Sequence, residues 1–207
     1  MELKYPKVTM ERIQDVWDKL GGEDGVDKLL NGKIVVQQFV SKPILRCILD
    51  DADLVIPACD GTHTLAQASD VFKSLIDPDF KNWGLDKSGK PTPKTKVAVH
   101  EMAKYATFAG MLGFFGIDLD KLCLTQHQIE IFCKKLTDTD WLRAYGYGTF
   151  FLTKKDWEKP ATFGNFFIVR VNVDFVGLRV YAFRFERDYV WTSADYQHHL
   201  VVPQLET

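Results

Sequence analysis

The densest group of reactive side chains lies in residues 54–72, which read LVIPACDGTHTLAQASDVF. Around one glycine this stretch places the thiol of Cys59, the carboxylate of Asp60 and the imidazole of His63. A thiol becomes a nucleophile when a helix N-terminus and a nearby imidazole lower its pKa, so Cys59 with His63 as its base is one interpretation. The two residues are four positions apart across a turn, however, and no cysteine-enzyme signature surrounds them.

The same stretch could instead bind an anion. Gly61 would let a phosphate approach the backbone at the start of a helix, where unpaired N–H groups attract negative charge. The hydroxyls of Thr62 and Thr64 and the ring of His63 could donate to that phosphate. Against this interpretation, no GxxxxGK[ST] or GxGxxG motif is present, and the carboxylate of Asp60 repels an anion unless a metal intervenes.

A purely structural interpretation gives every residue of the stretch a local role. Residues 54–56 end a strand, Asp60-Gly61 is a standard turn pair, and Thr64-x-x-Gln67 is a capping box at the start of a helix. The buried face of that helix is formed by Leu65, Ala68, Phe72, Leu75 and Ile76. We favour this interpretation and keep the nucleophile and the anion site as alternatives.

Two other groups contain residue types that bind metals. Cys123, His127 and Cys133 are close in sequence, and His198-His199 lie near the end of the chain. Zinc requires four ligands in a tetrahedron, and the spacings of the first group match no familiar zinc motif. Neighbouring residues on a strand point to opposite faces, so at most one of the two adjacent histidines can face a given site. We expect no metal and no other cofactor.

The second half of the chain offers a surface of a different kind. From Tyr145 onward the hydrophobic period changes from 3.6 to 2, which predicts strands near 147–153, 165–174, 178–186, 189–192 and 197–202. Their alternation indicates a sheet face that mixes arginines with aromatics, formed by Arg170, Arg179, Tyr181, Phe183 and Arg187. Such a face can dock a protein partner or stack single-stranded bases, although no RNP-like motif is present. Alternatively, its aromatics pack on helices and its arginines line a solvated edge.

Composition narrows the class of protein. The chain has 207 residues, of which 46% are hydrophobic and 26% charged, with a net charge of −2. This balance provides no field to attract nucleic acid or an anionic membrane. Four cysteines without a CxxC pair indicate reduced thiols. The start of the chain lacks a signal-peptide core, and the longest uncharged apolar run, 105–117, is shorter than the ~20 residues that span a bilayer. We expect a cytoplasmic protein without a membrane segment.

The sequence of the N-terminal part predicts two helices. Thr9 is the expected N-cap of the first, Gly21-Gly22 ends it, and a short second helix covers roughly 23–30. Residues 9–32 carry three basic and six acidic side chains, which argues against a DNA-binding helix-turn-helix. Strand-like sequences follow at 33–40 and 46–57.

The central part is polar and then helical. Phe80 and Trp83 are expected to anchor a polar stretch whose second half, 86–96, is a mobile loop or a subdomain boundary. Helices are expected over roughly 95–115 and after the capping box Thr125-x-x-Gln128. The fold class is therefore α+β in a single domain over 1–207, with an N-terminal helical hairpin, short strands and central helices. A C-terminal antiparallel meander of four to five strands packs one face on those helices.

Several stretches carry a resemblance to known sequences. VWDKLGGEDGVDKLL, DLVIPACDGTHTLAQA, DPDFKNWG, LCLTQHQI, GYGTFFL and LVVPQL resemble a family of uncharacterised proteins predicted from bacterial genomes, many of them from small-genome lineages. The resemblance spans most of the chain. It implies a bacterial, cytoplasmic protein and carries no activity, cofactor or site residue.

Together these observations predict a small intracellular binding or interaction module rather than an enzyme. No pair of ionisable groups has a spacing that a known chemistry demands, and the partner is expected to be a protein or a small ligand. One alternative is a phosphate- or nucleotide-type ligand site, or an enzyme, at the junction 56–64. Another is single-stranded nucleic-acid binding through the C-terminal sheet.

Overall fold

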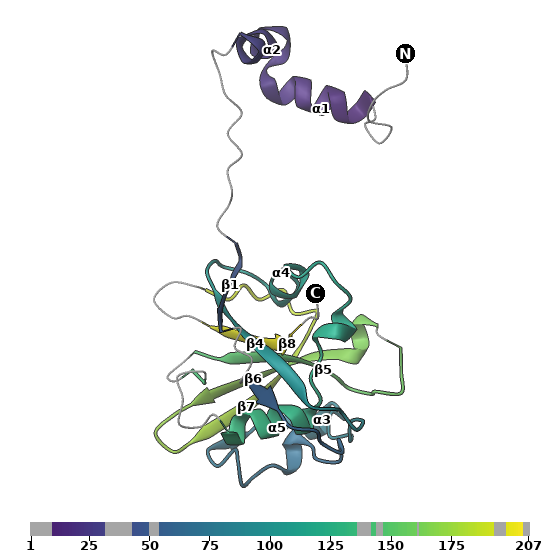
Figure 1. The fold of residues 1–207 in the computed structure, drawn as a ribbon, viewed down its shortest axis with the longest axis vertical. Helices are drawn as coiled ribbons and strands as arrows, with labels where there is room; N and C mark the ends of the chain where they lie inside the picture. The colour runs from purple at the N-terminus through teal and green to yellow at the C-terminus, as the bar shows by residue number, and fades with distance from the viewer. Residues whose placement is uncertain are drawn as a thin grey trace. The chain divides into compact units, whose positions relative to one another are not determined.

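The structure, a computed structural model, describes residues 10–31, 43–49, 54–135, 142–143, 147–160, 162–192 and 198–204. The chain divides into two compact units, Met1–Ser41 and Lys42–Thr207. The first unit contains helices α1 and α2, and the second contains the sheet and the other helices (Figure 1). The predicted subdomain boundary at 86–96 lies inside the second unit.

In the first unit, a pair of glycines lies at the junction of two helices. Helix α1 spans Met10–Leu20 and α2 spans Gly22–Leu30. Gly21 and Gly22 have φ angles of 88° and 72°, a left-handed conformation that other residues rarely adopt. The prediction that this pair ends the first helix is therefore confirmed. The expected N-cap Thr9 and the expected strand 33–40 lie outside the described residues.

The described part of the second unit forms one mixed sheet of eight strands. Its order is β1-β4-β8-β5-β6-β7-β3, and β2 pairs with β4. The strands are β1 (Leu45–Leu49), β2 (Val55–Ile56), β3 (Leu75–Ile76), β4 (Thr95–Met102), β5 (Thr149–Lys154), β6 (Phe166–Val173), β7 (Leu178–Arg184) and β8 (His199–Pro203). The helical segments are η1 (Leu65–Gln67), α3 (Asp79–Asn82), α4 (Phe108–Gly113), η2 (Leu119–Leu122), α5 (Gln126–Lys135) and η3 (Phe163–Asn165).

The α+β class is confirmed, but the purely antiparallel meander is wrong. Strands β5, β6 and β7 do follow one another as antiparallel neighbours. Strand β8 leaves this series and lies between β4, to which it is antiparallel, and β5, to which it is parallel. Strand β3 adds a second parallel pair beside β7. The segment expected as a strand at 189–192 contributes one isolated bridge, Trp191 with Ala106.

One predicted helix is wrong, and another is right only in part, because α4 lies within the helix expected over roughly 95–115. Residues 95–102 form the long strand β4, because β1 and β8 bind its two edges and tertiary pairing overrides local preference. Residues 64–76 form only the single 3₁₀ turn η1 before β3, since Leu75 and Ile76 pair with β7. The later capping box is confirmed. Gln128 accepts from the Thr125 backbone N–H at 2.9 Å, and the Thr125 hydroxyl accepts from the Gln128 N–H at 3.2 Å.

Both faces of the sheet are packed, whereas one covered face was expected. Helices α3 and α5 lie on one side of the sheet and α4 on the other (Figure 1). The core on the α5 side includes Val97, Val99, Phe151, Val169, Val171, Val180 and Val201. The core on the α4 side includes Leu45, Met102, Phe150, Leu152, Ile168 and Leu200. Within β6 the two sets alternate, as the period-2 pattern predicted.

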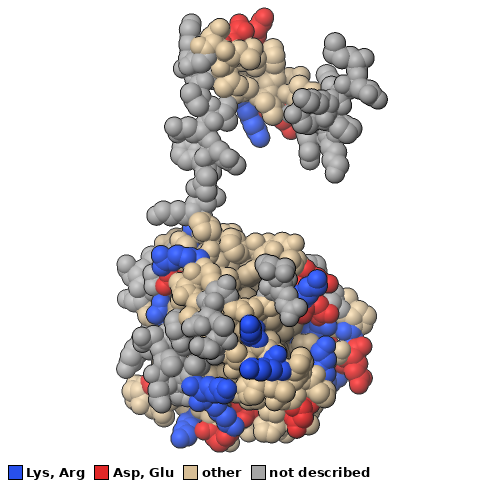
Figure 2. All heavy atoms as spheres, viewed as in Figure 1, with Lys and Arg blue, Asp and Glu red and all other residues tan. Residues whose placement is uncertain are grey.

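The surface carries both signs of charge. Figure 2 shows basic and acidic side chains interspersed over the visible face of the second unit, in keeping with the net charge of −2. Among the described helices, none has the length and apolar character that crossing a bilayer requires.

Candidate functional site

The structure separates the thiol of the 59–64 turn from its imidazole. Cys59 pairs with Thr92 in a short β-bridge, and its Sγ lies 3.0 Å from the Thr92 hydroxyl. His63 is directed instead toward α5, where its contacts are His127 and Glu130. The arrangement therefore does not supply the thiol–imidazole pair that nucleophilic catalysis by Cys59 would need.

Asp60 and His63 meet two side chains of α5. Nδ1 of His63 lies 3.1 Å from Oε2 of Glu130, and Nδ1 of His127 lies 3.0 Å from Oδ1 of Asp60. The second contact is at ion-pair distance but lacks hydrogen-bond alignment. The two imidazoles stack with centroids 4.2 Å apart. We call His63, His127, Asp60 and Glu130 the histidine cluster.

Charges around the cluster are balanced. The Glu130 side chain is 3% exposed, and its second oxygen accepts from Lys134 at 2.7 Å. Hydrogen bonds to Glu130 and then to Asp70 raise the pKa of Lys134. The backbone N–H and the hydroxyl of Thr62 lower the pKa of Asp60, with a smaller contribution from His127. Asp60 is thus held in its charged form by partners within the chain, and Glu130 has a cationic partner in Lys134.

The turn itself is tightly packed. Gly61 has a φ of 77°, and a Cβ at this position would lie 2.2 Å from the carbonyl oxygen of Lys90. The Gly61 carbonyl accepts from the N–H of Gly89 at 2.8 Å, and the Thr62 carbonyl accepts from the Ser88 hydroxyl at 3.1 Å. Segment 86–96 therefore contacts the turn through several hydrogen bonds and close packing. The composition of this segment had suggested a mobile loop instead.

The residues predicted to bind a phosphate have partners within the chain. Lys90 fills the space beside Gly61, the Thr62 hydroxyl donates to Asp60, and Thr64 is 2% exposed and donates to Gln67. An anion site at Gly61, Thr62 and Thr64 stays a prediction.

The sequence analysis did not identify most of the α5 residues that contact Asp60 and His63. His127 was considered only as a zinc ligand, and Glu130, Lys134 and Asp70 were not singled out. Residues 127, 130 and 134 recur at helical spacing along one face of α5, which was the available indication. No group of three or more His, Cys, Asp or Glu in the described ranges is arranged to hold a metal.

A small hollow adjoins the cluster. Its volume is about 200 Å³. The side chains around it are His63, Thr64, Gln67, Ala68, Asp70, Glu130 and Lys134. The exposed edge of the His63 ring, which is 54% accessible, thus borders a polar recess.

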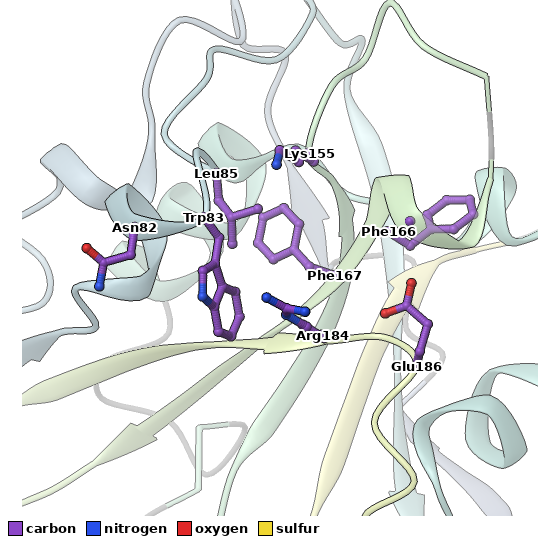
Figure 3. Close-up of a pocket in the computed structure, with 9 residues that line it drawn as sticks. Asn82, Trp83, Leu85, Lys155, Phe166, Phe167, Arg184 and Glu186 are labelled. Carbon is purple, nitrogen blue, oxygen red and sulfur yellow. The ribbon is translucent and has the colours of Figure 1, made fainter.

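A larger recess lies beside Trp83. It has a volume of about 480 Å³ and adjoins a second hollow of about 550 Å³. Trp83, Arg184 and Glu186 line both, and we call the pair the Trp83 groove. Figure 3 shows the Arg184 guanidinium beside the Trp83 indole, with the ring of Phe167 next to them and the Glu186 carboxylate directed into the open space.

The fold builds this groove from distant segments. The parallel β3–β7 pair brings α3 next to β7, and Trp83 follows α3 directly. Phe80, fully buried, packs edge-on against Phe167 of β6 and fixes α3 in place. Arg184, the last residue of β7, therefore meets Trp83, with its guanidinium carbon 5.1 Å from the ring centroid. The prediction that Phe80 and Trp83 anchor their segment agrees with this packing.

The predicted arginine–aromatic surface is divided. Phe183 and Arg187 line the groove. Arg179 instead pairs with Asp174 and Ser74. Arg170 lies half-buried over the rings of Tyr181 and Trp191, and burial lowers the pKa of its guanidinium.

The adjacent histidines near the end of the chain are both buried. His198 is 5% exposed, and its Nδ1 accepts from the Gly148 N–H at 3.0 Å, so its proton resides on Nε2 in the neutral ring. Burial, followed by the charge of Arg170, lowers its pKa to about 4. The ring is therefore neutral near pH 7 and serves packing.

No protein-family model matches the chain, and neither a curated protein nor a solved structure shows significant similarity to it. The resemblance to bacterial proteins of unknown activity stays a prediction. Function must therefore be argued from the two sites themselves.

Proposed function

We propose that the protein is a binding module, and that its Trp83 groove binds a small ligand with a planar ring and a negative charge, as in a nucleotide. The observation that supports this proposal is the stacking of the Arg184 guanidinium over the Trp83 indole at the wall of a recess of about 480 Å³. Ligand pockets in proteins usually have volumes of ~300–1,000 Å³.

The aromatic walls suit a planar ring. The indole of Trp83 is only partly buried, and Phe183, also partly buried, lines the adjoining hollow. A flat ring placed against such faces gains dispersion and quadrupole interactions regardless of its identity. The groove can thus stack a nucleobase without forming hydrogen bonds that distinguish one base from another.

The charged walls suit an anion. Lys155, Arg184 and Arg187 line the two hollows, against one carboxylate, that of Glu186. An excess of positive charge in a recess of a protein with net charge −2 concentrates anions there. Arginine forms two parallel hydrogen bonds with a phosphate, and Glu186 can accept from an amino or hydroxyl group of the same ligand.

Thermal shift and isothermal titration with AMP, GMP and UMP test the proposal. Adenosine and ribose 5-phosphate serve as half-ligands that retain only the ring or only the charge. We expect at least one nucleotide to raise Tm and both half-ligands to bind at least tenfold more weakly. Arg184→Met keeps the aliphatic stem and removes the charge, so it should weaken binding about tenfold or more.

The exposed Lys94 lies outside both linings, so Lys94→Gln is the matched control for loss of one positive charge and should bind as the natural chain does. If no ligand changes Tm, or if Arg184→Met binds normally, the proposal is wrong. Arg187 also stacks on the exposed Tyr189, which extends the surface beyond the groove. An oligonucleotide that binds far more tightly than a mononucleotide would therefore favour single-stranded nucleic acid as the ligand.

A further inference from the structure

We propose that His63 is a general base, and that the hollow beside it is a catalytic site for the hydrolysis of small, uncharged esters. This activity goes beyond ligand binding in the Trp83 groove. The described residues that line the hollow include none of those that line the groove. The inference rests on how Glu130, Lys134 and His127 hold one exposed imidazole.

The contact with Glu130 fixes the tautomer of His63. A carboxylate can only accept a hydrogen bond, so Nδ1 of His63, 3.1 Å from Oε2 of Glu130, must carry the proton. The neutral ring then has its lone pair on Nε2. All five histidines of the chain are described, and His63 is the exposed one. His63 is thus the imidazole that a substrate from solution reaches most readily.

The ring is also held in place. Glu130, 3% exposed, is fixed by Lys134 at its other oxygen, so it presents Oε2 to His63 in one position. His127 stacks on one face of the imidazole with a 5° angle between the ring planes. A base that is oriented by a buried carboxylate matches the general requirement for an activated catalytic base.

The hollow is also lined by groups that can stabilise the negative charge formed when water attacks the ester carbonyl. The Gln67 Oε1 accepts from the Thr64 hydroxyl at 3.2 Å, which leaves the amide NH₂ as a donor. The positively charged Lys134 also lines the hollow. Both favour negative charge that develops on a carbonyl oxygen. Asp70 and Glu130 balance Lys134 and make an uncharged ester preferable to an anionic one.

The reaction needs only water as co-reactant. Nε2 of His63 takes a proton from water, the water oxygen bonds to the ester carbonyl carbon, and the carbonyl oxygen becomes an oxyanion beside Gln67. The oxyanion then re-forms the double bond, and the bond to the alkoxide breaks. The alkoxide takes the proton from Nε2, which releases an alcohol and a carboxylic acid and restores neutral His63.

Steady-state hydrolysis of 4-nitrophenyl acetate by the full chain tests the proposal. We expect saturable turnover, and His63→Gln should lower kcat by about 100-fold or more. Glu130 is a positioning residue. Glu130→Gln should therefore lower kcat about tenfold with little change in KM, because the amide can also donate to Nδ1 and no longer fixes the tautomer with a bare Nε2. Lys94→Gln, at an exposed lysine outside the lining of the hollow, should hydrolyse the ester as the natural chain does.

A second measurement does not depend on the variants. Long-range ¹H–¹⁵N spectra of the natural chain should show His63 protonated at Nδ1 and bare at Nε2. The proposal is overturned if His63 carries its proton on Nε2, if His63→Gln turns over at the natural rate while keeping its Tm, or if turnover per site does not exceed that of free imidazole. These outcomes leave nucleotide binding in the groove untouched, so the two proposals fail independently.

Discussion

The imidazole of His63 lies flat on that of His127, with centroids 4.2 Å apart and ring planes 5° from parallel. The stack joins the 59–64 turn to α5, and each ring has a carboxylate at its Nδ1, Glu130 for His63 and Asp60 for His127. The 59–64 turn, whose residue types suggested a reactive centre, is therefore held in place by contacts with α5, a helix more than 60 residues later in the chain. We therefore expect the position of the His63 ring to depend on that attachment.

Substituting Gly61 tests the packing of the turn. Gly61→Ala places a Cβ 2.2 Å from the Lys90 carbonyl oxygen at a φ of 77°, so we expect a loss of about 3 kcal/mol in the free energy of unfolding. Gly116→Ala is the matched control, because Gly116 has a φ of 63° but no atom within 4 Å of the added Cβ. It should cost only about 1 kcal/mol. Urea unfolding of both variants gives the comparison, and equal losses would show that Lys90 does not close over the turn.

The two Thr-x-x-Gln motifs should differ in strength. Gln128 closes a buried, reciprocal capping box with Thr125 and also donates to the half-buried Thr95. Gln128→Ala leaves the Thr125 N–H without that acceptor and should cost about 2 kcal/mol. Gln67 is exposed and its partner is the Thr64 hydroxyl, so Gln67→Ala should cost less than about 0.5 kcal/mol. Chemical denaturation that ranks the two variants in the opposite order would contradict this account of the caps.

Stability should fall in acid because of His198. Its folded-state pKa of about 4 lies below the ordinary value of 6.5, so the unfolded chain binds the proton more readily. The free energy of unfolding is then highest above pH 6.5, decreases as the pH falls from 6.5 to about 4, and levels off below. The difference between the two pKa values corresponds to a loss of at most about 3 kcal/mol in the free energy of unfolding.

His198→Asn removes the titration and keeps an acceptor near the Gly148 N–H. Its free energy of unfolding should therefore change less between pH 6.5 and pH 4 than that of the natural chain. Denaturant titrations at a series of pH values measure the difference, and an unchanged slope would rule out His198 as its source.

The four thiols should react in a fixed order. Cys47 is exposed, and Cys59 is half-buried beside Thr92. Burial raises the pKa of Cys123 and Cys133, which removes the reactive thiolate as well as access. With Ellman's reagent at pH 8 we expect rapid reaction at Cys47 and slower reaction at Cys59. Cys123 and Cys133 should react only after unfolding, and Cys47→Ser should abolish the rapid phase alone. Four rapid equivalents in the folded chain would contradict the burial.

Features set by neighbours a few residues apart were predictable. The box between Thr125 and Gln128 and the break at Gly21-Gly22 depend on local hydrogen bonds and on φ angles that glycine tolerates. The alternation of β6 depends only on the geometry of a strand. The same level of reasoning also located Asp60 and His63, because reactive residue types near a glycine are visible in any sequence.

Features set by distant pairing were not predictable. Residues 95–102 contain Ala, Lys, Glu and Met, which favour helix, and they become a strand because β1 and β8 flank them. Glu130 reaches His63 from 67 positions away. The Trp83 groove arises because the two-residue strand β3 runs parallel to β7 and carries Trp83 to Arg184. A pair so short leaves no periodic pattern that sequence reasoning could detect.

Strand β8 lies between β4 and β5, although it follows both in the chain. Residues 199–203 are therefore synthesised after both strands that they join, so the β4 and β5 edges cannot pair with β8 until these residues have been made. Until then those edges expose unpaired backbone groups that neighbouring nascent chains can bind. Completion of the sheet is thus a late event, and a chain cut before His199 has the sequence of both halves but lacks the strand that unites them.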